Sequence, residues 1–558
     1  MMKPMQNLLT TISGEQRRGD IRGGLQAAAL SLPLALAFGL LSGAGPVAGF
    51  YGAICVGFLA AMFGGTQAQI SGPTGPTALV LAAVITSFPG APEKVFTVVM
   101  LAGFAQMVFG ALGLGKYTYL LPYPVISGWA SGIGTVIIIM QLAPLLGLPP
   151  MSHPTQALMH LSSDLHDVNS DALVLGVLSL AVALSVPTRF RHLLPPHLLA
   201  LIVGTLAGTL VFTEAPRLGP IDSVLPTLQA FTMTQADMNT MLFAALSIAL
   251  LGSIDSLLAS MAADAKTHTY HNSDRELMGQ GLGNLVAGLF GAVPGAGATV
   301  RTMTNIHWGG RTRLSGVVCS GTLLLTLLIF SLLLERIPVA VLSGILIKVA
   351  LDIIDWRYLR RARTAPRTGL TLMFTVMALT VVFNLVLAVA VGVIAASLLF
   401  VKRMADVELE AVKTFDNTAG ETSLDDAEAR AMDRLTGQVF IIRFSGPMSF
   451  GAANRLHRRL AGYENYQVLI LDLRDVSSAD SSAVMALENI INNARDDNHT
   501  VILVGLNTTV ARKFALLGVL DLIRDVERYQ DLLEALDYAA KVLNIDVTDQ
   551  PAEDATRD

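Results

Sequence analysis

The sequence predicts a polytopic α-helical membrane protein that ends in a separate α/β domain. Of its 558 residues, 52% are hydrophobic and 15% are charged, whereas an average soluble domain is roughly 25% charged. Long apolar runs recur up to about Lys402, and beyond that point charges are dense and apolar runs are short. This change divides the chain into a membrane region, residues 21–403, and a region outside the membrane.

The N-terminal end carries no sign of a removable leader. Residues 1–20 are polar and lack an apolar core followed by a cleavage site, so we interpret them as a cytoplasmic segment. The two cysteines, Cys55 and Cys319, lie in apolar runs. We expect both as buried small side chains rather than as a disulfide or a metal pair.

Fourteen apolar segments make up the membrane region, in two series of seven. The first series, within residues 21–213, covers about 23–41, 47–63, 76–88, 95–114, 125–146, 172–186 and 198–212. The second, within residues 239–403, covers about 242–263, 277–292, 298–306, 314–334, 339–353, 369–383 and 385–401. Several are shorter than the roughly 20 residues that a straight span needs. Because seven is odd, two halves of one fold would be inserted upside down relative to each other, as an inverted repeat.

Lysine and arginine gather on one side of this predicted bundle. That side receives Arg17, Arg18, Arg22, Lys116, Arg189, Arg191, Lys266, Arg275, Arg311, Arg313, Arg357, Arg360, Arg361, Arg363, Arg367, Lys402 and Arg403. The other side receives only Lys94, Arg217 and Arg336. The positive-inside rule therefore places both termini in the cytoplasm, and we expect a multi-pass protein of the cell (inner) membrane in contact with lipid.

Two Gly/Pro-rich stretches interrupt the third segment of each half, at residues 70–76 and 293–299. Each is predicted to be an extended piece that leads into a short helix, and such backbone persists at membrane depth only where protein or a water-filled cavity satisfies it. Helix N-termini attract anions, and paired broken segments are typical of a transporter's binding site. The alternative is that these glycines serve tight helix crossings.

Asp255 is the one charged residue of the segment 242–263 and lies near its centre. A carboxylate at that depth costs about 2.5–3.5 kcal/mol on insertion scales, so it normally faces a cavity, a partner or an ion. We expect it beside the two broken segments, where the three pieces together would build a pocket for an anion and a companion cation.

The C-terminal region alternates strands and helices. Strands are predicted at 438–444, 467–473 and 500–504, and helices near 450–460, 482–493, 509–517 and 529–543. We expect a compact α/β domain over residues 437–545. The acidic segment at 404–436 before it is predicted to be a linker, with a first strand and a mobile loop as the alternative. Residues 546–558 are expected to be disordered.

Several short motifs recur in a known family: those at 32–38, 71–76, 123–128, 279–284 and 309–312, and Asp480-Ser481-Ser482 in the tail. By these motifs the chain resembles the sulfate permease (SulP) anion transporters, also called solute carrier family 26, and its tail resembles a STAS domain. The resemblance implies a fourteen-segment, seven-plus-seven inverted repeat with a core and a gate domain. It also implies an elevator-like motion and a homodimer held partly through the STAS domain.

Within the family, the sequence resembles the BicA-type sodium-dependent bicarbonate transporters at 40–45, 141–144, 295–299, 348–356 and 445–450. The resemblance implies that sodium is held by Asp255, Thr74, Gly297, Ala298 and Thr299. Carboxylate, hydroxyl and backbone oxygens are ligands that a hard cation prefers.

The same resemblance implies an anion site lined by backbone N–H groups and one aromatic face. Its residues would be Phe38, Thr74, Gly75, Ala298 and Thr299. A bound cation beside the two helix N-termini would bring the anion in as an approximately neutral pair. For Phe38, plain core packing is the alternative.

Two residues depart from the BicA-type pattern. Ala259 stands where the sodium site has a further hydroxyl, although Ser256 and Ser260 are near. Arg301 stands where that type has glycine and many other family members have arginine, which lends positive charge to the anion site. A fixed guanidinium could replace the sodium ion, which would favour exchange, proton coupling or a dicarboxylate. The alternative for Arg301 is a side chain that reaches cytoplasmic water.

The sequence therefore predicts a secondary active transporter of a small inorganic anion, with sodium-dependent bicarbonate symport as the main expectation. A proton-coupled sulfate or C4-dicarboxylate transporter, an anion exchanger and an anion sensor are the alternatives. No enzyme is expected, because the apolar part holds no nucleophile–base pair or metal cluster. We expect no cofactor besides a co-transported sodium ion and no nucleic-acid partner.

In the tail, Ser481 and Ser482 resemble the phosphorylated turn of anti-sigma-factor antagonists. A phosphate there would gain from the helix N-terminus. An N-cap serine is the alternative explanation.

Overall fold

The computed structural model describes residues 13–120, 122–151, 153–187, 195–219, 226–383, 385–410, 412–415, 424–435, 437–449 and 466–545. The chain divides into two compact units, Met1–Ile394 and Ala395–Asp558. We describe each by itself.

The first half of the membrane unit contains the helices of the first predicted series. They are α2 (Gly14–Leu41), α3 (Pro46–Phe63), α4 (Gly75–Ser87), α5 (Pro92–Ala111), α6 (Tyr123–Leu145), α8 (Ser170–Ser185) and α9 (Pro196–Leu210). A short strand, β1 (Ser71–Pro73), precedes α4. Two 3₁₀ turns, η1 (Leu114–Leu120) and η2 (Asp164–Asp167), and the helix α7 (Pro154–Ser163) lie in connections where no helix was predicted.

The second half repeats this order. Its helices are α10 (Met238–Thr267), α11 (Ser273–Leu289), α12 (Thr299–His307), α13 (Arg313–Leu334), α14 (Val339–Ile353), α16 (Arg367–Val382) and α17 (Leu385–Glu410), with the short α15 (Trp356–Arg360) before α16. The strand β2 (Gly295–Gly297) precedes α12 as β1 precedes α4. Each of the fourteen predicted segments is a helix, which confirms the predicted fold class.

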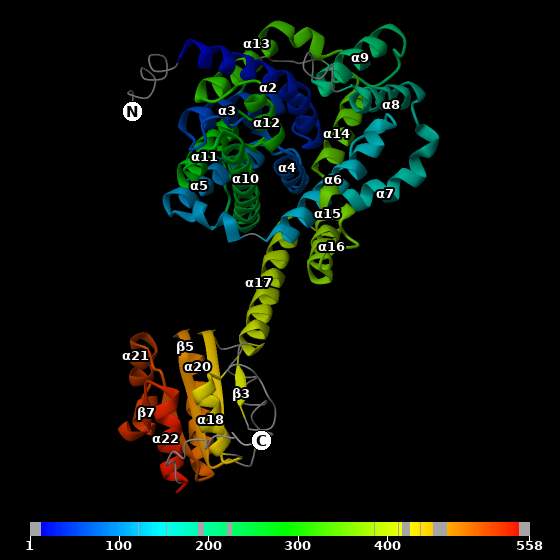
Figure 1. The fold of residues 1–558 in the computed structure, drawn as a ribbon. Coiled ribbons are helices and arrows are strands. Elements are labelled where there is room, and N and C mark those ends of the chain that lie inside the picture. The colour runs from blue at the N-terminus through cyan, green and yellow to red at the C-terminus, as the bar shows by residue number, and fades with distance from the viewer. Residues whose placement is uncertain are drawn as a thin grey trace, which may run out of the picture. The chain divides into compact units, whose positions relative to one another are not determined.

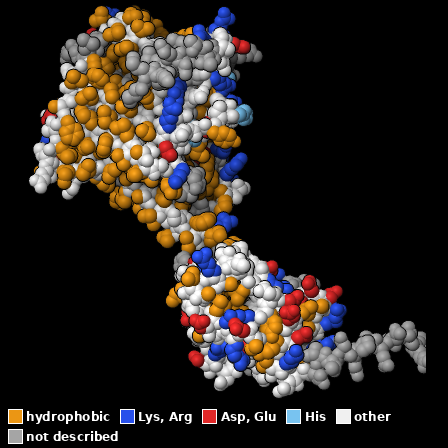
Figure 2. All heavy atoms as spheres, turned by 90° about the vertical axis from the view of Figure 1, so that its left-hand side faces the viewer, with side chains coloured by type: hydrophobic (Ala, Val, Ile, Leu, Met, Phe, Trp, Pro, Cys, Tyr) orange, Lys and Arg blue, Asp and Glu red, His pale blue; other side chains and the backbone are white. Residues whose placement is uncertain are grey.

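The outer surface of this unit is apolar. Among the described residues, seven helices are long and apolar enough to cross a membrane, and four shorter apolar helices accompany them. On α13, Leu325, Ile329 and Leu332 are 57%, 66% and 74% exposed. Figure 2 shows hydrophobic side chains spread over the membrane unit, whereas charges of both signs cover the C-terminal unit. An exposed apolar surface of this extent is what lipid covers.

The helices sort into two bundles (Figure 1). In the first, α5 packs on α10 and α11, α3 on α11 and α13, α2 on α12 and α13, and α4 on α10 and α2. In the second, α6 packs on α14 and α16, and α14 on α8 and α9. Each bundle takes matching helices from both halves of the chain. They correspond to the expected core and gate domains, and we call them the core bundle and the gate bundle.

Glycines allow the closest contact within the core bundle. A Cβ on Gly103 of α5 would lie 2.3 Å from the amide nitrogen of Leu285, and one on Gly281 of α11 would lie 2.5 Å from the carbonyl of Gly103. Without Cβ atoms the two backbones approach directly, as in other small-residue helix crossings.

The C-terminal unit is a five-stranded sheet with helices on its faces. The strand order is β3-β4-β5-β6-β7, with β3 antiparallel to β4 and the other pairs parallel. The elements are β3 (Lys413–Phe415), α18 (Asp426–Arg434), β4 (Val439–Met448), β5 (Val468–Ala479), α20 (Ser481–Asp496), β6 (Thr500–Val504), α21 (Thr508–Leu516), η3 (Val519–Leu522), η4 (Asp525–Glu527), β7 (Arg528–Tyr529) and α22 (Leu532–Val542).

The sheet has an apolar core on each face, one below α20 and α21 and the other below α18 and α22. Part of the segment 404–436, expected as a linker, thus joins the sheet as β3 and its covering layer as α18. The helix predicted at 450–460 and the disorder predicted at 546–558 lie outside the described residues.

Candidate anion and cation site

The two broken segments meet as a small antiparallel ribbon. Ser71 pairs with Gly297, Gly72 with Ala296 and Pro73 with Gly295, and the amide of Ala298 donates to the carbonyl of Ile70 at 3.0 Å. The ribbon satisfies backbone groups that no helix could satisfy here. Because its strands are antiparallel, the ribbon also sets the starts of α4 and α12 beyond opposite ends of the three paired residues.

Asp255 of α10 lies against one end of this ribbon. The Thr74 hydroxyl donates to Asp255 Oδ2 at 3.2 Å, and the neighbouring Thr77 hydroxyl donates to the carbonyl of Pro294 at 2.9 Å. The Asp255 side chain is partly buried, and no lysine or arginine of the described residues forms an ion pair with it. The structure therefore brings Asp255 and Thr74 together and leaves the carboxylate without a protein counter-charge.

The residue after Asp255 fixes the other strand. Ser256 Oγ accepts a hydrogen bond from the amide of Gly297 at 2.9 Å and donates to the carbonyl of Gly252 at 2.6 Å. Ser260 Oγ donates to Gln69 Oε1 at 2.7 Å, and Ala259 is fully buried. The two serine hydroxyls thus serve the ribbon and Gln69, and neither replaces the hydroxyl that the BicA-type pattern has at Ala259.

The anion-site residues differ in how open they are. Phe38 is buried and lies beside Gly75, since a Cβ on Gly75 would be 3.9 Å from Phe38 Cε1. Ala298 is half-buried and Thr299 is exposed. Thr299 lines a cavity of about 680 Å³ between α2, α10 and α12 of the core bundle and α8, α9 and α14 of the gate bundle, whereas Phe38, Thr74 and Gly75 do not line it.

Arg301 points into the protein instead of into that cavity. Its side chain is 2% exposed, and Nη2 donates to the carbonyl of Pro73 at 2.6 Å. The other terminal nitrogen, Nη1, lies against Gly72, where a Cβ would come within 2.7 Å of it. The guanidinium therefore supports β1 from inside the protein and does not reach water.

A row of buried polar side chains on α11, formed by Glu276, Gln280 and Asn284, was not predicted from the sequence. Gln280 Nε2 donates to Ser71 Oγ of β1 at 2.6 Å, and Asn284 bonds both backbone groups of Gly295 in β2, at 2.7 and 2.9 Å. Both side chains are buried. Their spacing of four residues on one helix, together with Glu276, was the signal available in the sequence.

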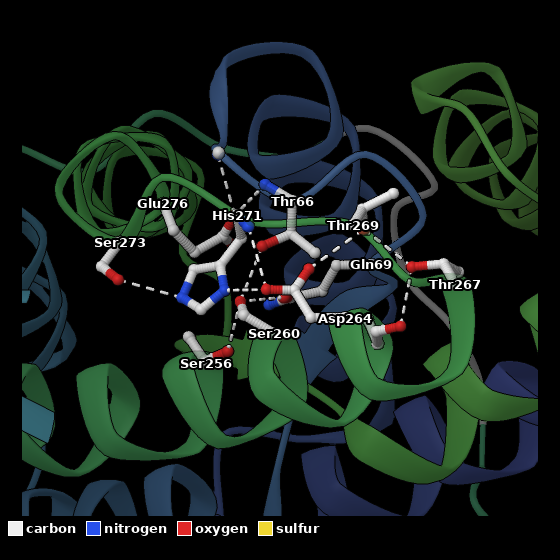
Figure 3. A network of polar contacts seen from close by, with 12 residues as sticks. Thr66, Gln69, Ser256, Ser260, Asp264, Thr267, Thr269, His271, Ser273 and Glu276 are labelled. Atoms are coloured by element: carbon white, nitrogen blue, oxygen red, sulfur yellow. Dashed lines mark hydrogen bonds and ion pairs between the residues drawn. The ribbon is translucent and has the colours of Figure 1, made fainter. Parts of the chain in front are cut away.

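Glu276 extends this row to the segment that leads into β1. Its carboxylate accepts the amides of Gly65 and Thr66 at 2.9 and 2.8 Å and an N–H of Gln280 at 2.8 Å. Figure 3 shows how Glu276 and Thr66 lie beside Ser260 and Gln69, and these four residues link the segment before β1 to α10 and α11. Asp264, in the last turn of α10, bonds His271 in the following connection and is not bonded to the ribbon.

In the C-terminal unit, α20 begins at the predicted serines. Ser481 and Ser482 are its first two residues and both are exposed. The N-cap is Asp480, whose Oδ1 accepts the amide of Ala483 at 2.7 Å. Capping therefore does not account for the serines, and phosphorylation stays a prediction.

Comparison with known proteins points in the same direction as this geometry. Residues 18–376 match the model of the sulfate permease family, and residues 430–535 match the STAS domain. The chain is 42% identical to the bicarbonate transporter BicA of a Picosynechococcus species over 90% of both chains. It is 31% identical to the putative sulfate transporter YvdB of Bacillus subtilis, over 88% of this chain and 91% of the relative.

Comparison with solved structures supports the same family. The transmembrane domain of a cyanobacterial BicA is 43% identical, covers 69% of this chain and 98% of its own length, and superposes with a TM-score of 0.62. The murine Solute Carrier 26 family member A9 anion transporter shares the fold with a TM-score of 0.81 at 20% identity, over 96% of this chain and 94% of its own. The chain is thus a member of the sulfate permease (SulP/SLC26) family of anion transporters, with a C-terminal STAS domain.

Proposed function

We propose that the protein is a sodium-dependent bicarbonate symporter of the cell membrane. The observation that carries the proposal is the Asp255 carboxylate, which lies 3.2 Å from the Thr74 hydroxyl at the end of the ribbon and has no basic partner among the described residues. A carboxylate at membrane depth without a counter-charge is stabilised by a cation. The 42% identity to a bicarbonate transporter supports bicarbonate as the anion.

The proposed sodium ligands are the Asp255 carboxylate, the Thr74 hydroxyl and oxygens of the Gly297–Thr299 turn. All belong to the core bundle, and Ser256 ties that turn to α10 one residue from the acid. The anion would bind beside the ion, at the starts of α4 and α12, where backbone N–H groups and the positive helix ends face it.

An elevator-type motion suits this arrangement. Phe38, Thr74, Asp255 and Thr299 all lie on core-bundle elements, so a movement of that bundle against α6 and α14 of the gate bundle would carry the site as one piece. The cavity that Thr299 lines also has Lys266 and His307 on its wall, at the ends of α10 and α12. Arg275 and Arg313 lie in the first turns of the helices that follow these ends. We assign this basic end to the cytoplasm by the positive-inside rule.

Replacement of sodium tests the proposal directly. Radiolabelled bicarbonate uptake into proteoliposomes is measured in sodium and in choline at one pH, with sulfate and succinate as competitors. We expect uptake to require sodium and to be insensitive to both competitors. Equal uptake in choline would eliminate sodium coupling.

The buried Arg301 guanidinium favours a second candidate, an anion exchanger or a proton-coupled sulfate or dicarboxylate transporter. It brings a fixed positive charge to within 2.6 Å of the Pro73 carbonyl, one residue before Thr74. Sodium-independent uptake with strong competition by sulfate or succinate would support this candidate.

A further inference from the structure

The cavity that opens at Thr299 contains a histidine whose ring has no partner. His197 is the second residue of α9 and is 6% exposed. Neither ring nitrogen has a hydrogen-bond partner among the described residues, although the residue lines the cavity of about 680 Å³. Buried polar groups are nearly always satisfied, and an orphaned one is costly. The imidazole is therefore placed to form a hydrogen bond with a ligand that enters the cavity.

A lysine of the adjacent helix α14 shares this wall. Lys348 Nζ lies 2.5 Å from both carboxylate oxygens of Asp352, and its side chain is 16% exposed. An ammonium group has three donors, so two are given to Asp352 and one is left for a ligand. The other titratable groups on the cavity wall are Lys266, at the end of α10, and His307, at the end of α12.

We propose that His197 and Lys348 form a second anion-binding site, on the gate bundle, that selects a hydrogen-bearing oxyanion such as bicarbonate. This inference rests on the proposed function for the identity of the anion. The site shares its cavity with Thr299 and with Lys266 at the basic end of α10, and it is separate from the ion site because α9 and α14 belong to the other bundle.

The chemistry of the two groups explains the selectivity. A neutral imidazole offers one N–H donor and one bare nitrogen acceptor. Bicarbonate carries an O–H together with anionic oxygens, so it can donate to the bare nitrogen and accept from Lys348. Sulfate and chloride at neutral pH can only accept, and the nearby Asp352 carboxylate opposes a dianion more than a monoanion.

Because α9 and α14 belong to the gate bundle, this site would remain at the basic end when the core bundle moves. An anion leaving Thr299 would pass His197 only on that side. The effect of a substitution should therefore depend on the face from which bicarbonate is supplied, which a purely structural defect would not produce.

The test compares the two faces of one membrane. Labelled bicarbonate transport is measured in right-side-out and inside-out vesicles, whose orientation is fixed by protease access to the C-terminal unit. For His197→Ala we expect the KM at the basic face to rise about fivefold, the effect of losing one hydrogen bond, with the KM at the opposite face unchanged. His197→Gln, which keeps a donor and an acceptor, should recover most of the loss.

His307→Ala is the matched control, because His307 is an exposed histidine on the same cavity wall. It should change neither KM. In His197→Ala, sulfate should also compete better at the basic face than it does in the wild type.

Three outcomes would overturn the site: an equal change at both faces, no change at either face, or loss of folded protein in both His197 variants. If the wild type transports another anion instead of bicarbonate, the proposed function fails separately. The same comparison of faces with that anion then decides whether His197 binds it.

Discussion

At the scale of single residues, the site depends on two charged side chains, Asp255 and Arg301, and on what each of them contacts. Asp255 accepts from Thr74 and has no cationic side chain at ion-pair distance among the described residues, while Arg301 is turned toward the Pro73 carbonyl. Two opposite charges thus lie near the same ribbon without forming an ion pair. An ion that enters beside Asp255 would supply the missing counter-charge.

Removal of the Asp255 charge tests the cation role. Asp255→Asn keeps an oxygen that can accept from Thr74 but loses the negative charge, so sodium-driven uptake should fall by about a hundredfold, or about 2.7 kcal/mol of binding. The rise in thermal stability that sodium gives the wild type should disappear as well. Uptake and melting temperature with and without sodium are measured in purified protein.

Asp264→Asn is the control for that change, because it is the same substitution on the same helix and its carboxylate bonds His271 rather than the ribbon. It should retain sodium-dependent uptake. Near-normal sodium-driven uptake by Asp255→Asn would remove the ion role of this carboxylate.

Arg301 is expected to brace β1 rather than to replace sodium. Arg301→Gln removes the charge, and its side chain is two bonds too short to replace the Nη2 bond to the Pro73 carbonyl. The sodium concentration for half-maximal uptake should still change less than about threefold. Stability should fall by about 1–3 kcal/mol, as for other impaired buried hydrogen bonds. Uptake that becomes strictly dependent on sodium only in this variant would contradict that role.

At the scale of elements, a two-stranded ribbon at membrane depth is stable only because two helices hold it. Ser256 of α10 binds Gly297, and Gln280 and Asn284 of α11 bind Ser71 and Gly295. The ribbon is too short to be stable by itself, since even an isolated hairpin is marginal in water. Its geometry is therefore set by side chains from elsewhere in the chain.

Asn284→Asp tests this support. The carboxylate cannot donate to the Gly295 carbonyl or to Gln106 Oε1, both of which Asn284 contacts at 2.9 and 2.7 Å. We expect uptake to fall at least about tenfold, since an unsatisfied buried group costs about 1–3 kcal/mol. Met278→Leu, on the exposed side of α11, should leave uptake unchanged, and equal uptake by both variants would refute the support role.

A Cβ at Gly297 would crowd the strand. An alanine there would place its Cβ 1.8 Å from Gln69 Nε2 and 3.0 Å from the Cα of Ser256. Gln69 would have to rotate and the strand or α10 would have to shift by a few tenths of an ångström, so Gly297→Ala should lower uptake. Gly321→Ala, within α13 and with open space around it, should transport normally and gain slightly in helix stability. Normal uptake by Gly297→Ala would show that the ribbon can shift.

At the scale of the whole molecule, the membrane unit and the STAS unit are stabilised differently. The first exposes apolar side chains that lipid covers and holds its polar groups inside. The second has two apolar cores and a buried ion-pair network, in which Arg443 and Arg474 bind Asp472 at 2.7 and 3.0 Å and Glu428 at 3.1 and 2.9 Å. Acid should therefore act on the STAS unit through this network.

Burial alone would raise the pKa of Asp472, but hydrogen bonds from Arg474 and Arg443 outweigh it and lower that pKa below its usual value. A lowered pKa stabilises the folded state above the unfolded pKa of about 4, and the stabilisation is lost as pH falls through the folded value. We expect the melting temperature of a fragment covering residues 405–558, followed by circular dichroism, to drop between pH 5 and pH 3.

Asp472→Asn should lower stability at pH 7 by about 3–5 kcal/mol, because two arginines lose a buried partner, and should flatten the pH dependence. Asp537→Asn, an exposed carboxylate on α22, should keep the wild-type slope. An unchanged slope in Asp472→Asn would show that other carboxylates dominate acid unfolding.

Much of the architecture could be predicted because it is local. Apolar runs marked the long membrane helices, because a helix that crosses lipid needs about 20 mostly apolar residues. The short α4 and α12, with 13 and 9 residues, were marked by the Gly/Pro-rich stretches that precede them. The helices α7 and α15 were missed, since one is amphipathic and the other is five residues of a basic loop. The strand β3 confirms one of the two alternatives predicted for the acidic segment before the α/β domain, which was a linker or a first strand with a mobile loop.

The sequence by itself determined that this chain crosses a membrane, that its two halves repeat, and that Asp255 and two broken segments are the unusual features of the apolar part. Periodicity, composition and the cost of a buried charge are local properties, and they can be read from neighbours in the chain. Only the tertiary structure decided that the broken segments pair with each other, that Arg301 turns to Pro73, and that Gln280, Asn284 and His197 face the ribbon and the cavity. The contacts of Arg301 with Pro73 and of Gln280 with Ser71 join residues 228 and 209 positions apart, and such distant pairings are not encoded by the spacing along the chain.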